Sequence, residues 1–221
     1  MKRLLFASIC LAALLADASA GTAVVIKDPR QDPAVQQFQS KPVQDGAGDT
    51  PFQLSLITPA QLPPEDWDVN GFAINLLYGT SHNFKGLALG GLATRTTGRT
   101  DGLMIAGLAN VVESDSTSLQ ISLGVNYTEF AFTGMQIGAA NVAASDDNSG
   151  AEAFQIGALY NYANSINGVQ ISLLINRANF IKGLQIGLIN FAGDMVGVQI
   201  GLVNIIDSKD FPFVPIINGR F

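Results

Sequence analysis

One short sequence motif of apolar and polar residues recurs along the chain. The motif is clearest in two stretches, Gly183–Asn190 (GLQIGLIN) and Gly197–Asn204 (GVQIGLVN). A recurring motif marks structural units that cannot bury their apolar side alone, and we interpret residues 71–206 as nine such units. The nine copies begin at Gly71, Gly86, Gly102, Ser118, Gly134, Ala153, Gly168, Gly183 and Gly197, in steps of 14 to 19 residues.

Within each copy the apolar positions alternate with a period of two. In the last copy Val198, Ile200 and Leu202 share one face, whereas Gln199, Gly201 and Val203 share the other. A helix is disfavoured because two glycines in eight residues would each cost about 1 kcal/mol relative to alanine. The pattern therefore predicts β-strands and an all-β fold.

Two polar residues recur at fixed places in the copies, and charges avoid them. The cores, from each start to the closing position, contain no Asp, Glu, Lys, Arg, His or Pro, so the charged residues lie in the connections. We infer that the strands are shielded from water on at least one side. Glutamine recurs as Gln120, Gln136, Gln155, Gln170, Gln185 and Gln199, and asparagine closes the copies as Asn110, Asn126, Asn141, Asn161, Asn176, Asn190 and Asn204.

The segments around the repeats differ from them in composition. Phe52–Ile57 alternates like a strand, and the proline-containing stretch 58–64 ends it because proline cannot donate to a sheet. Residues 21–50 are rich in Gln, Asp, Pro and Lys and are typical of a flexible leader. We predict a β-repeat domain at 51–221, with a closing strand at 211–221 that ends on Phe221.

The first twenty residues have the pattern of a secretory signal peptide. Lys2 and Arg3 precede the apolar run Leu4–Leu15, and Ala18-Ser19-Ala20 is a small-residue cleavage site, so we expect cleavage after Ala20. Cys10 is the single cysteine and lies in this segment, so the mature chain has no thiol or disulfide chemistry. The residues before Cys10 fit a lipoprotein site poorly.

Charge and hydropathy narrow the functional classes. The net charge is −6, and removal of residues 1–20 leaves 10 basic and 17 acidic residues. This balance argues against nucleic acid as a partner, because a nucleic-acid surface is basic. Charged residues make up only 14% of the chain and the mean hydropathy is +0.28, whereas about 25% charge is typical of globular domains. The apolar side chains are therefore either stacked inside a repeat protein or turned toward lipid.

The first architecture that fits is an antiparallel meander closing into a barrel of roughly 10–11 strands, with one strand per repeat of 14–16 residues. In this barrel Val198, Ile200 and Leu202 face lipid while Gln199 and Gly201 point inward. Closure removes sheet edges that lipid would not tolerate. One strand before the repeats, nine repeats and one strand after give eleven, although bacterial barrels usually have an even number.

The alternative is a parallel β-solenoid with one repeat per coil. In it Gln and Asn stack in ladders, and Leu and Ile fill the interior. The spacing of the closing residue favours this fold: Asn204 lies seven residues after Gly197, but Asn110 lies eight after Gly102. A one-residue slip inside a strand reverses every later side chain, whereas a slip at a solenoid corner does less harm.

The copies at Gly183 and Gly197 resemble the short surface repeats of a family first described among leptospiral predicted surface lipoproteins. The resemblance covers 52–221, including the closing segment Phe211–Pro215 (FPFVP). It implies export and a place in the cell envelope, and it implies no catalytic residue. The copies at Gly71 and Gly86 match least, because Ala73 and Ala88 replace glutamine.

The remaining site candidates are weak. His82, the only histidine, lies in a connection without a second His or a Cys beside it, so we expect a solvated residue and not a zinc ligand. The acidic turn at 146–148 lacks the spacing of a calcium loop. Residues 86–91 (GLALGG) are repeat glycines, because no helix pattern follows them. Trp67 is expected to plug one end or to mark an interface.

These observations predict a non-enzymatic, exported envelope protein with no catalytic, cofactor-binding or metal-binding residue. We expect a barrel with a structural or surface role at the outer membrane or cell surface, with outer-membrane lipid as its partner. The alternative is a soluble or surface-attached solenoid that binds a partner along a Gln/Asn face. The protein partner and the oligomeric state stay open.

Overall fold

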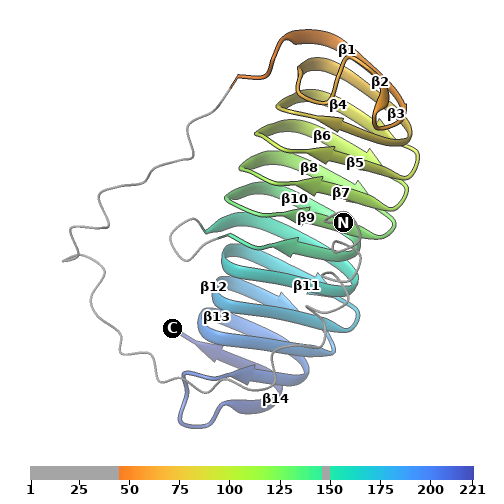
Figure 1. The fold of residues 1–221 in the computed structure, drawn as a ribbon. Helices are drawn as coiled ribbons and strands as arrows, with labels where there is room; N and C mark the ends of the chain where they lie inside the picture. Colours follow the sequence, from red (N-terminus) through yellow and green to blue (C-terminus); the bar gives the residue numbers. More distant parts are fainter. Residues whose placement is uncertain (1–44, 146–149) are drawn as a thin grey trace, which may run out of the picture. The chain divides into compact units, whose positions relative to one another are not determined.

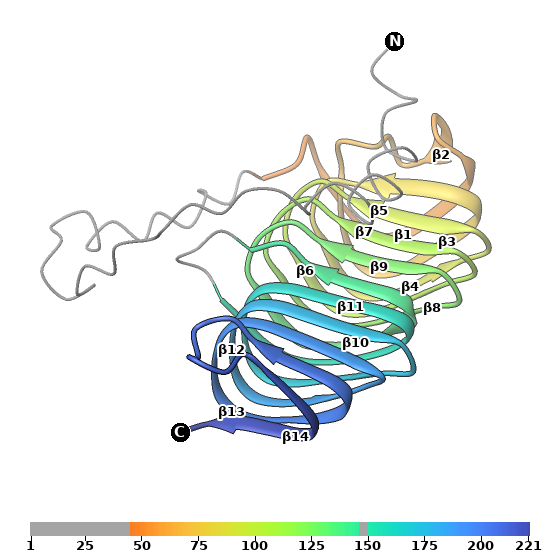
Figure 2. The same cartoon turned by 90° about the horizontal axis from the view of Figure 1, so that it is seen from below.

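The protein forms a β-solenoid in which one sheet winds coil upon coil (Figures 1 and 2). The structure is a computed structural model that describes residues 45–145 and 150–221, and these residues form strands and no helix. The predicted signal peptide lies outside them. The strands are β1 (Asp49–Ile57), β2 (Ala60–Leu62), β3 (Asp68–Ser81), β4 (Phe84–Gly90), β5 (Ala93–Thr96), β6 (Thr100–Ala106), β7 (Ala109–Val112), β8 (Ser116–Ser122), β9 (Val125–Thr128), β10 (Phe132–Ala143), β11 (Ala151–Ser172), β12 (Ile175–Ile186), β13 (Ile189–Ile206) and β14 (Phe213–Arg220).

Strand register confirms the nine repeats as nine coils, which we number from the one that starts at Gly71. Gly71 pairs with Gly86, and Gly86 with Gly102. At the other end Gly168 pairs with Gly183, and Gly183 with Gly197. Each repeat therefore stacks on the same positions of the repeat before it.

The predicted barrel is wrong, and the alternative solenoid is confirmed. Successive coils pair in parallel, as in β4–β6 and β6–β8. Antiparallel pairs occur among the described strands only at the two ends, as β1–β2 and β13–β14. The physical reason is that each repeat turns a corner in its middle, so the chain returns to its starting side one layer further on instead of reversing direction.

The corner also accommodates the unequal spacing of the closing asparagines. In coil five Asn141 lies seven residues after Gly134, and in coil six Asn161 lies eight residues after Ala153. Their register shifts between Gly138 and Ala140, at the corner, so both the Gln and the Asn positions remain paired. The extra residue therefore reverses no side chain within a strand.

Four columns of side chains fill the interior, and the repeat residues expected there, such as Leu184 and Ile186, are not among them. Two of the columns are the glutamines and the asparagines. The third column stands two residues after each asparagine, and its buried members include Ala143, Ala163, Ala178 and Ala192. The fourth column stands two residues before each coil start, and its buried members include Phe132, Ile166, Ile181 and Met195. Among these members the third column holds alanine, and the fourth holds larger apolar side chains.

The glutamines form a continuous ladder with no exposed surface. From Gln136 onward, each Nε2 donates to the Oε1 of the preceding coil's glutamine, at 3.0 Å in Gln136–Gln120 and 2.7 Å in Gln199–Gln185. The same Nε2 group also donates to a backbone oxygen on the other strand of its own coil, as from Gln170 to Arg177 at 3.3 Å. The ladder thus joins coil to coil and also holds the two strands of each coil together.

The asparagines form a second buried ladder that donates in the opposite direction. Asn110 Nδ2 donates to Asn126 Oδ1 at 2.9 Å, and the pattern continues to Asn190 and Asn204 at 2.8 Å. Each donor therefore reaches the following coil, whereas the glutamine donors reach the preceding one. Since buried amides need partners to offset their desolvation, these ladders make a polar interior compatible with folding.

Two end layers cover the stack. At one end β1 pairs in parallel with β3 and places Gln53 at the glutamine position, where its Nε2 donates to Asn75 Oδ1 at 3.3 Å. The predicted break after Ile57 instead forms β2, which folds back on β1. At the other end β14 runs antiparallel to β13, with Asn218 opposite Gln199.

Candidate interaction surface

An uncharged outer face runs along all nine coils. It comprises the residues one and three positions after each coil start, such as Leu184 and Ile186 in coil eight. Every member is apolar and none is buried; Phe72 is 55% exposed and Phe154 50%. We call these residues the outer apolar face. With coils about 4.8 Å apart, its eight spacings make it about 38 Å long.

A row of leucines follows the corner where this face ends. Every coil except the fifth contributes an exposed leucine there, and Leu123 and Leu173 protrude most, at 82% and 75% exposure. We call this row the leucine ridge: Leu76, Leu92, Leu108, Leu123, Leu159, Leu173, Leu188 and Leu202. Continuous apolar surface of this extent marks an interaction site.

Charges occupy other parts of the coil. Beyond the corner, the second strands of coils two and seven carry Arg95 and Arg177. Asp101 and Lys182 each stand one residue before a coil start. Arg95 Nη2 pairs with Glu113 Oε1 at 2.7 Å. The cross-section of the solenoid is therefore amphipathic, with an apolar corner on one side and the charged connections away from it.

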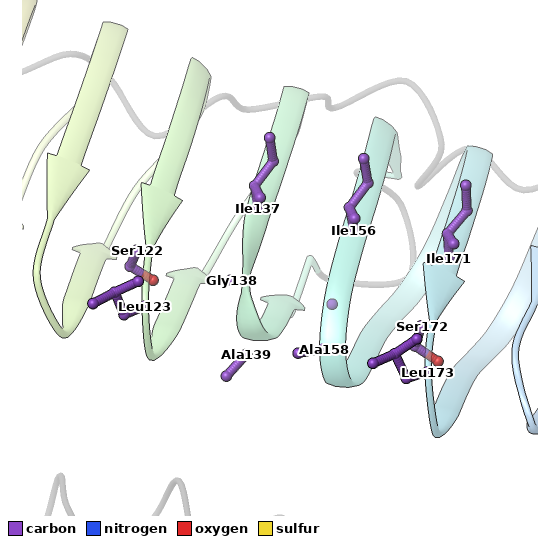
Figure 3. A pocket seen from close by; sticks show the side chains of 11 residues that line it. Ser122, Leu123, Ile137, Gly138, Ala139, Ile156, Ala158, Ile171, Ser172 and Leu173 are labelled. Atoms are coloured by element: carbon purple, nitrogen blue, oxygen red, sulfur yellow. The ribbon is translucent and has the colours of Figure 1, made fainter.

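A hollow of about 400 Å³ lies at coils five and six, beside the place where coil five has no ridge leucine. In Figure 3 Ala139 and Ala158 lie between Leu123 and Leu173, while Ile137, Ile156 and Ile171 follow one another on successive coils. Alanine stands at these two places where coils four, seven, eight and nine have leucine. The missing side-chain volume explains the hollow.

Aromatic side chains gather on the second strand's outer side near the middle of the stack. The rings of Tyr160 and Tyr162 are stacked with centroids 6.4 Å apart. The Arg177 guanidinium lies 5.3 Å from the centroid of the Phe191 ring, within the range of a cation–π contact. Burial raises the pKa of the Tyr160 phenol, so this side chain stays neutral at physiological pH and can lie at an apolar boundary.

The site candidates from the sequence lie elsewhere. His82 is not simply solvated, because its Nδ1 lies 3.0 Å from Asp68 Oδ1. The Trp67 ring packs against Gly48 before β1, at the β1 end of the stack. Residues 86–91 lie in β4 and the turn after it. The acidic turn at 146–148 lies outside the described residues. Residues 45–145 and 150–221 hold no cluster of three metal-ligating side chains.

Sequence reasoning missed Asp68, which organises the β1 end. Its carboxylate accepts hydrogen bonds from the backbone amides of Gly46 at 3.1 Å and Asn83 at 3.0 Å, and from Asn83 Nδ2 at 3.1 Å. Burial acts to raise the pKa of Asp68, but these hydrogen bonds outweigh it and the pKa lies below its ordinary value. No local sequence motif indicates the cluster around Asp68, because its members come from three separate segments of the chain.

Replacing Asp68 with asparagine should lower the free energy of unfolding by about 2 kcal/mol near pH 7, because bonds to a charged group are lost. The lowered pKa means that this contribution is complete above the unfolded carboxyl's pKa of about 3.9 and is lost as pH falls through the folded value. Urea unfolding of both proteins at pH 7 and pH 2.5 measures it. An equal difference at both pH values would contradict the assignment.

Comparisons with family models, curated proteins and solved structures give no match. Among residues 45–145 and 150–221, no helix combines the length and apolar character needed to cross a membrane. The functional argument therefore rests on the surface itself.

Proposed function

We propose that this protein is an exported, non-enzymatic component of the cell envelope that attaches to a lipid surface, at the outer membrane or cell surface, through the outer apolar face and the leucine ridge. The observation that carries the proposal is the uninterrupted lack of charge on this side of nine coils. The signal-peptide pattern of residues 1–20 and the resemblance to envelope repeats support export. No described cluster of side chains supports an enzyme.

A Gln/Asn face, the earlier alternative for partner binding, does not exist on the surface. The ladder residues Gln120 to Gln199 and Asn110 to Asn204 are buried inside the coils, so a partner cannot contact them. Any partner of the folded solenoid must instead meet the outer columns. The most extensive of these are apolar, which favours a lipid surface.

Burial in lipid would be strong enough to hold the protein. Full burial of a leucine side chain stabilises by about 1.5–3 kcal/mol, and the ridge leucines are between 45% and 82% exposed. Even partial burial of eight leucines would therefore contribute more binding free energy than one covalently attached acyl chain, which alone gives only marginal membrane binding. The net charge of −6 provides no attraction to lipid, so the attachment depends on apolar contact.

The triple variant Leu123→Glu/Leu173→Glu/Leu202→Glu should lose at least 100-fold in affinity for phosphatidylcholine vesicles, because three charges would enter the acyl region. Flotation with vesicles measures this, using the chain from Gly21 onward, which lacks the predicted signal peptide. Exposed ridge positions leave the fold intact, which circular dichroism verifies.

A matched control adds the same three charges to an exposed polar column, as Thr117→Glu/Thr133→Glu/Asn167→Glu. This variant should float like the wild type, and 0.5 M salt should release neither protein. Equal losses in the two triple variants, or release by salt, would show that the ridge does not mediate attachment.

A further inference from the structure

Within this apolar side, we infer that the hollow at coils five and six is a binding groove for a single acyl chain of a membrane phospholipid. The inference rests on the proposed lipid attachment, which places acyl chains beside the ridge. Alanine replaces leucine there at the fifth residue after the starts of coils five and six, so an acyl chain could enter without displacing a side chain.

Shape favours a narrow, extended ligand. Leu123 and Leu173 close the groove at its two ends, on coils four and seven. Three coil spacings separate them, which is about 14 Å along the solenoid axis. The volume of about 400 Å³ lies within the range of about 300–1,000 Å³ for small-molecule sites. An alkyl chain lying along the axis fits this form.

The chemistry of the lining favours the hydrocarbon part of a ligand. The side chains that face the hollow are Leu, Ile and Ala, and the hydroxyls of the two polar residues, Ser122 and Ser172, are buried without a hydrogen-bond partner among the described residues. No charged residue lines it. A ligand with polar groups would leave them without hydrogen-bond partners, at a cost in free energy, whereas an uncharged hydrocarbon matches the uncharged lining.

Filling the groove tests the inference without disturbing the fold. The variant Ala139→Leu/Ala158→Leu places leucine where the equivalent positions of neighbouring coils already carry it, so the coils should accept it. The control Ala93→Leu/Ala109→Leu adds the same atoms to the second strands of coils two and three, outside the groove. Both variants are made in the chain from Gly21 onward, without the predicted signal peptide.

The probe is laurate below its micellar concentration, titrated by calorimetry, and vesicle flotation is measured in parallel. We expect one laurate per wild-type or control chain, a loss of at least tenfold in affinity for the filled variant, and undiminished flotation for all three. Unchanged laurate affinity in the filled variant, or no saturable laurate binding to the wild type, would refute the inference that the hollow binds an acyl chain. Laurate binding that the filled variant loses, together with no flotation of any chain, supports the groove and refutes the lipid attachment.

Discussion

Replacing Gly183 with alanine should lower the free energy of unfolding by at least about 3 kcal/mol. Its φ is +145°, a backbone conformation that residues with a Cβ rarely adopt, and such strain alone costs about 1–3 kcal/mol. A Cβ at this position would also lie 1.9 Å from the backbone oxygen of Gly168. Since that oxygen belongs to the adjacent coil, relief requires the coils to separate.

The matched control for Gly183 is Ala153→Gly in the same column. Ala153 has no positive φ, so its replacement should cost only about 1 kcal/mol through the greater freedom of the unfolded chain. Guanidinium unfolding followed by circular dichroism compares the two. If Gly183→Ala falls within 1 kcal/mol of the wild type, the close approach of adjacent coils at this column is not a constraint.

Replacing Gln170 with glutamate should destabilise the solenoid by about 3–5 kcal/mol at pH 7, the cost of an uncompensated buried charge. The substitution removes the Nε2 donor to Gln155 Oε1, at 2.8 Å, and to the Arg177 backbone oxygen. A carboxylate there would face two acceptors. The ladder would lose a link in the middle of the stack.

The effect at Gln170 should depend on pH in a defined direction. Burial raises the pKa of the introduced carboxyl above its unfolded value of about 4.3. The destabilisation is therefore least below that pH and increases as pH rises through the folded pKa. Urea unfolding at pH 4.5 and 7.5 measures the change, with exposed Asn167→Asp as the control. A loss that is constant across this range would show that water reaches the ladder.

The repeat boundaries and the two polar columns could be predicted from the sequence, because both are properties of spacing. Gly86 and Gly102 start adjacent copies in the sequence and pair in the structure. The two ladders likewise contain every glutamine and asparagine that the repeat identified. Stacking of equivalent positions follows from repetition once successive copies run parallel.

Strand direction and the orientation of the two faces could not be predicted together. Alternation shows that Val198 and Ile200 share a face opposite Gln199, but it does not show which face is enclosed. The barrel hypothesis correctly placed these apolar residues on the outside but predicted antiparallel pairing, which is wrong. The solenoid hypothesis predicted the correct parallel pairing but placed leucine and isoleucine inside. A polar interior is unusual because each amide needs partners, and those partners, such as the Arg177 backbone oxygen for Gln170, become visible only in three dimensions.

The candidate surface was less predictable than the fold. The charge-free cores identified the residues of the outer apolar face, but only the solenoid brings the leucines of separate repeats into one ridge. The groove depends on Ala139 and Ala158 being adjacent across coils, which their separation of 19 residues does not suggest. Asp68 and Asn83 meet for the same reason, since their segments lie on successive layers.

The opposed donor directions of the glutamine and asparagine ladders affect how the stack can change in length. In an α-helix the peptide dipoles add to a macrodipole with partial charge at each end. Here the side-chain amides of the two ladders point in opposite directions along the axis, so an added coil contributes one dipole of each sense. Duplication or loss of a whole repeat therefore leaves the net side-chain dipole along the solenoid axis almost unchanged. The number of repeats can change without building up a macrodipole from the ladder amides.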